Sequence, residues 1–288
     1  MNLEAFLQKH HQPSTVKIYL FEIRHYIKWI GTARAEQASA KDVLSYLSYL
    51  RKRYDRTGTI HLIIQAIKRY YTYLQVIEKR EDHPCRLIKL RDFKKTGIQT
   101  QDLLTELELK ALLRNRKERY KGYALRNKII MSLLVNQALL TGEIAALKTN
   151  DIDLNKGTIF IHKASKTNER TLPLKAEQIL LLHQYLNECR PQLIKTKTDA
   201  LIITARGTAD QGEGIHYLVS TFRKRIPYKK LTPTTIRQSV IALKLKQGQD
   251  LRVVQVFAGH RSPSSTEAYR STNLEELKNA VEKYHPLK

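Results

Sequence analysis

Residues 231–270 read LTPTTIRQSVIALKLKQGQDLRVVQVFAGHRSPSSTEAYR and are the most informative stretch of the chain. Thr232 followed by Pro233 is typical of a helix start, because threonine accepts a hydrogen bond from an unpaired backbone N–H and proline fits the first turn. Gly248 and Gly259 stand where helices should end. The stretch therefore predicts two helices separated by a short connection.

The same stretch places three reactive side chains at fixed spacing. Arg237 lies in the first predicted helix, His260 directly follows Gly259, and Tyr269 comes nine residues after His260. This pattern resembles the C-terminal signature of the tyrosine recombinases, also called lambda-type phage integrases. In that family a helix with His-x-x-Arg precedes a Gly-His turn and then a tyrosine. Three features at fixed spacing are a much stronger signal than an isolated arginine or tyrosine.

Two earlier segments are similar to other motifs of this family. Residues 137–143, QALLTGE, are similar to a first motif in which a catalytic arginine stands three residues before a glutamate, here Glu143. Lys166 in the sequence Ala-Ser-Lys-Thr, with Arg170 behind it, is similar to the family's hairpin lysine. The N-terminal part has the size and charge of the family's core-binding domain, so the resemblance covers essentially the whole chain.

Cleaving a phosphodiester without a metal ion needs a nucleophile, fixed positive charge at the phosphate and an acid for the leaving 5′ oxygen. The resemblance implies that Tyr269 is the nucleophile and forms a 3′-phosphotyrosyl ester, which stores the bond energy for rejoining. It implies that Arg237 and His260 bind the phosphate. Lys166 would then protonate the leaving group, and Glu143 would support the orientation of the site. No cofactor and no metal are implied.

Two positions depart from the family pattern. Leu140 stands where the arginine of the first motif is expected, and Thr234 stands at the histidine of His-x-x-Arg. Leucine cannot replace a positive charge, and loss of one such donor costs on the order of 3–4 kcal/mol, or about 10²–10³ in rate. Thr234 keeps a hydroxyl that can contact a phosphate oxygen. Three alternatives stay open: another cation replaces the arginine, cleavage is slow, or the protein only binds DNA.

Each candidate also has an ordinary structural interpretation. Tyr269 is one of 15 tyrosines in the chain. Arg237 is compatible with a salt bridge on a helix surface, His260 with a helix cap, and Glu143 with a purely structural acid at a helix start. The hairpin lysine competes with Lys163 on the same hairpin. The shared spacing favours the functional interpretation of the set.

The N-terminal part is predicted to be a helical bundle. Helices with apolar residues at helical spacing are expected to begin near Ser14, Ser39 and Thr59, and Asp42 completes a capping box with Ser39. Residues 1–100 carry 19 lysines and arginines against 9 acidic residues. A bundle with this surplus is suited to binding phosphates.

The second part is predicted to be mostly helical, with a mostly apolar, buried helix over residues 126–139 and one small sheet. Residues 152–154 and 158–161 are separated by the turn Asn-Lys-Gly and predict a β-hairpin, and residues 170–174 predict a third short strand. We therefore expect a mainly α protein. Two helical domains should clamp DNA from both sides, and the second domain should contain a small antiparallel sheet.

Domain boundaries follow from breaks in the apolar pattern. We expect residues 1–90 to form the core-binding domain, residues 91–103 a linker, and residues 104–288 the catalytic domain. The closing segment, residues 273–284, is predicted to be a helix with one apolar face. The resemblance implies that this helix is exchanged with a neighbouring protomer.

The composition points to a polyanionic partner. The chain has 51 lysines and arginines and 27 acidic residues, a net charge of +24. Such a surplus repels itself in a compact fold and indicates nucleic acid before a membrane surface. Cys85 and Cys189 make neither a disulfide framework nor a zinc site. With no secretory signal and no apolar run of about 18 residues, the chain is expected to be cytoplasmic and away from membranes.

The predicted function is site-specific cleavage and rejoining of double-stranded DNA, as in integration or excision of mobile DNA. The resemblance implies a homo-oligomer, a tetramer on DNA. The alternative is a catalytically impaired or inactive DNA-binding protein on the same scaffold. A type IB topoisomerase shares the chemistry, but the N-terminal bundle and the closing helix favour a recombinase. The sequence leaves the target site, the direction of recombination and any accessory proteins open.

Overall fold

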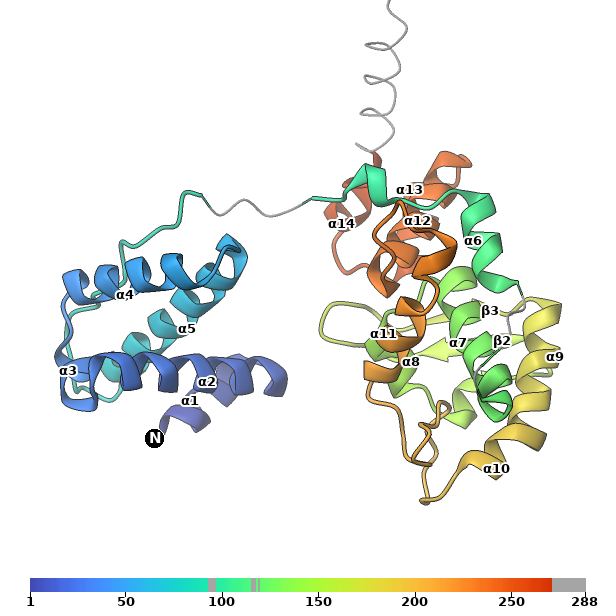
Figure 1. Cartoon of the computed structure of the whole chain (residues 1–288), viewed down its shortest axis with the longest axis horizontal. Coiled ribbons are helices and arrows are strands. Elements are labelled where there is room, and N and C mark those ends of the chain that lie inside the picture. The colour runs from blue at the N-terminus through green and yellow to red at the C-terminus, as the bar shows by residue number, and fades with distance from the viewer. Residues whose placement is uncertain (93–96, 115–117, 119, 271–288) are drawn as a thin grey trace, which may run out of the picture. The chain divides into compact units, whose positions relative to one another are not determined.

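The computed structural model describes residues 1–92, 97–114, 118 and 120–270. The chain divides into two compact units, Met1–Thr96 and Gly97–Lys288 (Figure 1). Each unit has its own apolar core. The predicted closing helix, residues 273–284, lies outside the described residues. No helix within the described part is long and apolar enough to cross a membrane.

The first unit is a helical bundle, as predicted. Its helices are α1 (Leu3–His10), α2 (Pro13–Ile30), α3 (Thr32–Gln37), α4 (Ala40–Arg53) and α5 (Thr57–Val76). The Ser39–Asp42 capping box is confirmed, since each side chain accepts the other residue's backbone N–H. Helix α2 begins at Pro13, slightly before the expected start, and ends at Gly31, whose φ of 92° is open to glycine.

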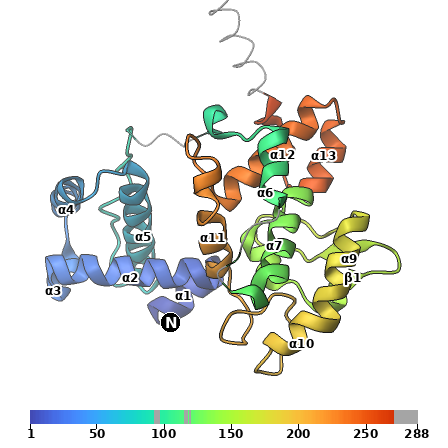
Figure 2. The same cartoon turned by 45° about the vertical axis from the view of Figure 1, so that its right-hand side comes forward.

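The second unit is mostly helical. Its described α-helices are α6 (Glu106–Leu113), α7 (Ala124–Asn136), α8 (Thr141–Ala146), α9 (Ala176–Gln184), α10 (Arg190–Leu193), α11 (Glu213–Ser220), α12 (Pro233–Lys246), α13 (Leu251–Ala258) and α14 (Ser264–Glu267). Helix α7 is packed among α6, α9 and α12 (Figures 1 and 2). It ends three residues before the predicted end at 139, and Ala138 beyond it has a φ of 52°, a left-handed conformation that stops an α-helix.

The predicted antiparallel sheet is confirmed, in the order β1-β2-β3. Its strands are β1 (Ile152–Asp153), β2 (Thr158–Ile161) and β3 (Arg170–Pro173). Ile159 of β2 lies opposite Leu172 of β3, and Ile161 lies opposite Arg170. Since side chains alternate along a strand, Arg170 and Leu172 share the buried face. The loop between β2 and β3 carries Lys166.

The helix boundaries around residues 231–270 are as predicted. Thr232 caps α12 and Pro233 is its first residue. Gly259 ends α13 with a φ of 69°. A Cβ at Gly259 would lie 2.5 Å from Nη1 of Arg170, so this position needs glycine for space as well as for conformation. The close approach brings the end of α13 against β3.

Candidate active site

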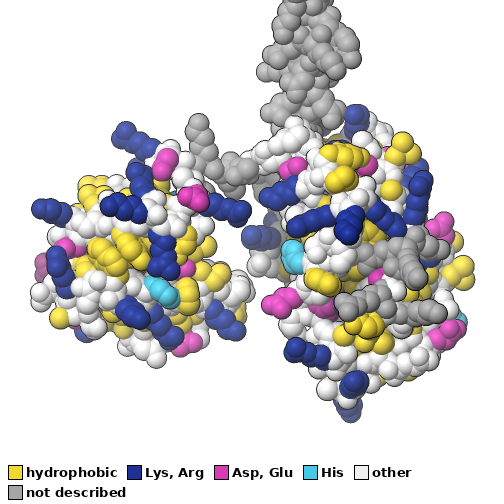
Figure 3. Space-filling view, in the orientation of Figure 1, with side chains coloured by type: hydrophobic (Ala, Val, Ile, Leu, Met, Phe, Trp, Pro, Cys, Tyr) yellow, Lys and Arg dark blue, Asp and Glu magenta, His cyan; other side chains and the backbone are white. Residues whose placement is uncertain are grey.

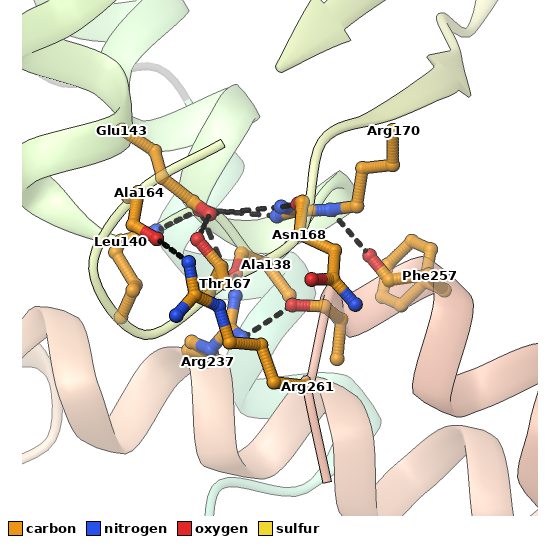
Figure 4. A network of polar contacts seen from close by, with 11 residues as sticks. Ala138, Leu140, Glu143, Ala164, Thr167, Asn168, Arg170, Arg237, Phe257 and Arg261 are labelled. Atoms are coloured by element: carbon orange, nitrogen blue, oxygen red, sulfur yellow. Dashed lines mark hydrogen bonds and ion pairs between the residues drawn. The ribbon is translucent and has the colours of Figure 1, made fainter. Parts of the chain in front are cut away.

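A buried ion pair forms the base of the site. Glu143, in the first turn of α8, is 4% exposed and accepts two hydrogen bonds from Arg170, at 2.8 Å and 3.0 Å (Figure 4). The Thr167 hydroxyl donates to Oε1 of the same carboxylate at 2.8 Å, and the Leu140 backbone N–H donates to Oε2 at 2.9 Å. The fork-to-fork geometry and the added donors make this a strongly oriented pair.

The carboxylate of Glu143 is ionised. Burial by itself raises its pKa, but the hydrogen bonds and charge of Arg170, with smaller contributions from the Leu140 N–H and Arg237, outweigh burial, so the net pKa is lowered. Glu143 is thus both a helix-start acid and the anchor of an arginine. The supporting role in the site that the resemblance implies for Glu143 stays a prediction.

Arg170 belongs to the hairpin motif that resembles the family, but the resemblance assigned it no role in the site. Its Nε also donates to the Phe257 carbonyl at 2.8 Å, which ties β3 to α13. A signal was present in the sequence: Arg170 is in phase with Leu172 on a half-buried strand, and an inward arginine needs an acidic partner. The identity of that partner followed only from the fold.

Arg237 points into the same network. It is 5% exposed, and it donates to the carbonyl of Ala138 at 2.6 Å and to that of Ala258 at 2.5 Å. Its Nη1 lies 3.8 Å from Oε2 of Glu143. The alternative of a salt bridge on a helix surface is therefore wrong, because the side chain is buried and its hydrogen bonds go to backbone carbonyls.

His260 is held from two sides. It forms a β-bridge with Thr167, and its Nδ1 lies 2.8 Å from the hydroxyl of the fully buried Thr266. Burial, with help from the charges of Arg237 and Arg170, lowers the pKa of His260 to about 4. The ring is therefore neutral near pH 7. If the Thr266 hydroxyl donates to Nδ1, the ring proton is on Nε2.

Tyr269 packs against His260. The two rings are stacked, with centroids 6.2 Å apart and an interplanar angle of 15°. Tyr269 is 7% exposed and belongs to a small apolar cluster with Ile241, Val254 and Ala258. Burial raises the pKa of its phenol, and the charge of Arg237 partly opposes that rise. The phenol is therefore protonated at neutral pH.

The other predicted positions lie nearer the surface. Lys166 is exposed in the β2–β3 loop, directly before Thr167. Leu140 is half-buried and caps α8 through its backbone, and Thr234 is exposed in the first turn of α12. The fold thus gathers Glu143, Arg237, His260 and Tyr269 into one group. The positions that flank this group are Lys166, Leu140 and Thr234.

The fold thus brings together a buried tyrosine, a neutral histidine and a buried, oriented arginine. The chain matches the phage integrase family over residues 102–276, and the N-terminal SAM-like domain of phage integrases over residues 2–79. The chain therefore belongs to the phage integrase family and is a tyrosine-type site-specific recombinase.

Relatives with assigned names match over nearly the full length. The tyrosine recombinase XerD of Ralstonia nicotianae is 27% identical over 277 residues, covering 95% of this chain and 88% of the relative. The tyrosine recombinase XerA of Thermococcus kodakarensis is 26% identical, covering 94% of this chain and 89% of the relative. Both matches span the two units.

Solved structures show the same fold. The XerH site-specific recombinase bound to its difH substrate superposes with a TM-score of 0.72 at 21% identity, covering 91% of this chain and 78% of that one. The Tn1549 transposon integrase bound to transposon end DNA gives a TM-score of 0.65 at 15% identity, covering 97% and 99%.

Proposed function

We propose that this recombinase cleaves and rejoins duplex DNA through a covalent bond between Tyr269 and a 3′ phosphate. The observation that carries the proposal is the packing of Tyr269 against a neutral His260, with Arg237 buried beside the Glu143–Arg170 pair. These side chains come from α8, β3, α12 and the segment after α13, so the fold assembles the site from distant parts of the chain.

Positive charge in this network is available to a phosphate. Arg170 and Glu143 neutralise each other, which leaves Arg237 as the remaining charge of the buried group. Its five N–H donors exceed its two carbonyl bonds, so donors remain for a non-bridging oxygen. In the tautomer in which Nδ1 accepts from the Thr266 hydroxyl, neutral His260 donates a second hydrogen bond from Nε2. Donors held in advance stabilise the charge that develops as phosphorus is attacked.

The reaction also requires two proton movements. The phenol of Tyr269 releases its proton to water as its oxygen bonds to phosphorus, and the charge of Arg237 favours that loss. The bond from phosphorus to the 5′ oxygen breaks, and Lys166 donates a proton to this leaving oxygen. Lys166 is exposed on a loop whose next residue pairs with His260, so the loop can place it on DNA.

The substrate that fits this charge distribution is double-stranded DNA. Lysine and arginine side chains spread over the visible faces of both units in Figure 3, in keeping with the net charge of +24. We further propose that residues 1–90 are a core-binding domain, joined to the catalytic domain by the linker 91–103. On DNA the protein forms an oligomer whose protomers exchange residues 273–284. It acts in the cytoplasm, in the integration or excision of mobile DNA.

The test is covalent capture on DNA. Duplexes selected from a random pool by binding to the purified protein are nicked near their centre, incubated with the protein and resolved on a denaturing gel. Wild-type protein should form an adduct, and Tyr269→Phe should form none while binding the duplex with nearly unchanged affinity. Tyr228→Phe, an exposed tyrosine in the same unit, is the matched control. An adduct that survives Tyr269→Phe would place the nucleophile elsewhere.

A second function is favoured by one observation. Leu140 brings no charge to the site and Thr234 brings no imidazole, so both altered positions weaken the phosphate contacts that the family pattern supplies. The runner-up is a DNA-binding protein on the recombinase scaffold that cleaves slowly or not at all. It predicts tight binding without any adduct on nicked duplexes, which the same gel distinguishes.

A further inference from the structure

The missing charge at Leu140 leaves room for a second cation at the phosphate. Of the arginines drawn in Figure 4, Arg170 is paired to Glu143 in a buried fork, and Arg237 is buried against two carbonyls. Neither side chain can swing to a new position without breaking several buried hydrogen bonds, each of which is costly to lose. A replacement cation must therefore come from a more accessible side chain.

Arg261 has the required properties. It directly follows His260, is exposed, and donates from Nη2 to the carbonyl of Ala164 at 2.8 Å. Ala164 lies in the β2–β3 loop, and its N–H donates to the Thr167 carbonyl at 3.0 Å. Figure 4 shows the Arg261 guanidinium directed toward this loop, within the network that also contains Leu140.

A chain of contacts links this guanidinium to the altered position. The loop that it contacts continues to Thr167, whose hydroxyl donates to Glu143, and Glu143 accepts the backbone N–H of Leu140. Thr167 also pairs with His260, the neighbour of Arg261 in sequence. One location is therefore surrounded by the β2–β3 loop, the start of α8 and residues 260–261.

We propose that Arg261 is a catalytic residue that binds the scissile phosphate in place of the arginine absent at position 140. The inference rests on the proposed function. The bond from the Arg261 guanidinium to the exposed Ala164 carbonyl joins a charge to a neutral acceptor, whereas a bond to a phosphate oxygen joins two opposite charges and is stronger. Arg261 can therefore exchange the Ala164 carbonyl for the phosphate when DNA binds. Its fork then contacts a non-bridging oxygen and stabilises the charge that develops there.

The first test measures adduct formation on the selected nicked duplexes. Arg261→Ala should slow it by about 10²–10³-fold, the effect of removing one preorganised donor. Arg206→Ala, an exposed arginine in another loop of the same unit, is the matched control and should match the wild type. A rate for Arg261→Ala within twofold of the control would overturn the proposal.

Moving the charge separates a catalytic role from a structural one. In the Arg261→Ala background, Leu140→Arg should raise adduct formation by at least about tenfold. The guanidinium at position 140 then supplies to the same phosphate the charge that was removed at position 261. In the wild-type background Leu140→Arg should add little, since a cation is already present. A large gain from Leu140→Arg alone would show that Arg261 does not fill the position.

A third readout works without cleavage. Each backbone phosphate of the selected duplex is replaced in turn by an uncharged methylphosphonate, and binding is measured. At one phosphate, the methylphosphonate should weaken DNA binding by the wild type and by Arg206→Ala, but leave DNA binding by Arg261→Ala unchanged. An identical interference pattern in all three proteins would overturn the phosphate contact. If the wild type forms no adduct, the proposed function fails, and this pattern still decides whether Arg261 binds a phosphate.

Discussion

The two units differ in what they bury. Among the described residues, the buried side chains of the first unit are apolar or aromatic. Its buried side-chain hydrogen bonds join the hydroxyls of Tyr26 and Tyr71 at 2.6 Å and the Tyr71 hydroxyl to the Ala35 carbonyl at 3.1 Å. The 12 buried polar or charged side chains of the described chain all belong to the second unit.

The difference separates apolar side chains that stabilise a unit from buried charged side chains that form the candidate site. Burying apolar side chains is enough to hold a helical bundle together. Buried charges often contribute no net stability, because desolvation offsets their attraction. Under the proposed function, the charges concentrated around Glu143 and Arg237 serve as oriented donors for a phosphate. The following variants test whether the two units respond as differently as their interiors suggest.

The largest effect on stability is expected at Glu143. Glu143→Ala leaves Arg170 and Arg237 buried without a counter-charge, which should lower the free energy of unfolding of the second unit by about 3–5 kcal/mol. Urea unfolding followed by circular dichroism should show this loss. Glu36→Ala, which removes an exposed ion pair with Lys79 in the first unit, should leave both transitions in place. Equal shifts from the two variants would contradict the comparison.

A core deletion in the first unit should act on that unit alone. Ile67, fully buried in α5, is a pure packing residue. Ile67→Ala should lower the free energy of unfolding of the first unit by roughly 2–4 kcal/mol, because it leaves a cavity. Leu44→Ala, at a position that is 48% exposed, should have little effect. If Ile67→Ala also destabilised the second unit, the two units would unfold as one.

His260 should give the second unit a distinct pH dependence. Its folded pKa is about 4, below the ordinary value of 6.5, so the unfolded chain takes up a proton first as the pH falls. The stabilisation is complete above pH 6.5 and decreases from there towards pH 4. The ring is only partly buried, so we expect a change on the order of 1 kcal/mol.

Urea titrations at several pH values measure this slope. His260→Gln should flatten it, and His183→Gln, an exposed histidine on α9, should leave it unchanged. A slope that survives His260→Gln would assign the effect to another group.

The smallest effects are expected at surface lysines. The logarithm of DNA affinity should fall linearly with the logarithm of salt concentration, by about 0.9 for each phosphate neutralised. Lys52→Ala at the end of α4 and Lys224→Ala before α12 should each reduce this slope by about 0.9 if both units bind phosphates. Filter binding between 50 and 200 mM salt measures the slopes, and unchanged slopes for both would mean that these basic clusters do not contact DNA.

Local signals explain how much of the fold was predictable. The capping box at Ser39, the hairpin around residues 152–161 and the glycine end of α13 depend on neighbours within a few residues, and all are confirmed. The end of the helix predicted to reach residue 139 was misplaced. Apolar periodicity continues past the point where Ala138 leaves helical conformation.

The sequence by itself determined the family, the sheet and the spacing of Arg237, His260 and Tyr269, because these follow from residue order. The tertiary structure decided which groups carry charge and where they point. The pairing of Glu143 with Arg170, 27 residues away, and the lowered pKa of His260 arise from burial and from charges brought close by folding. Burial and distance in space depend on the packing of α8, β3 and α13 together, and no local pattern encodes them.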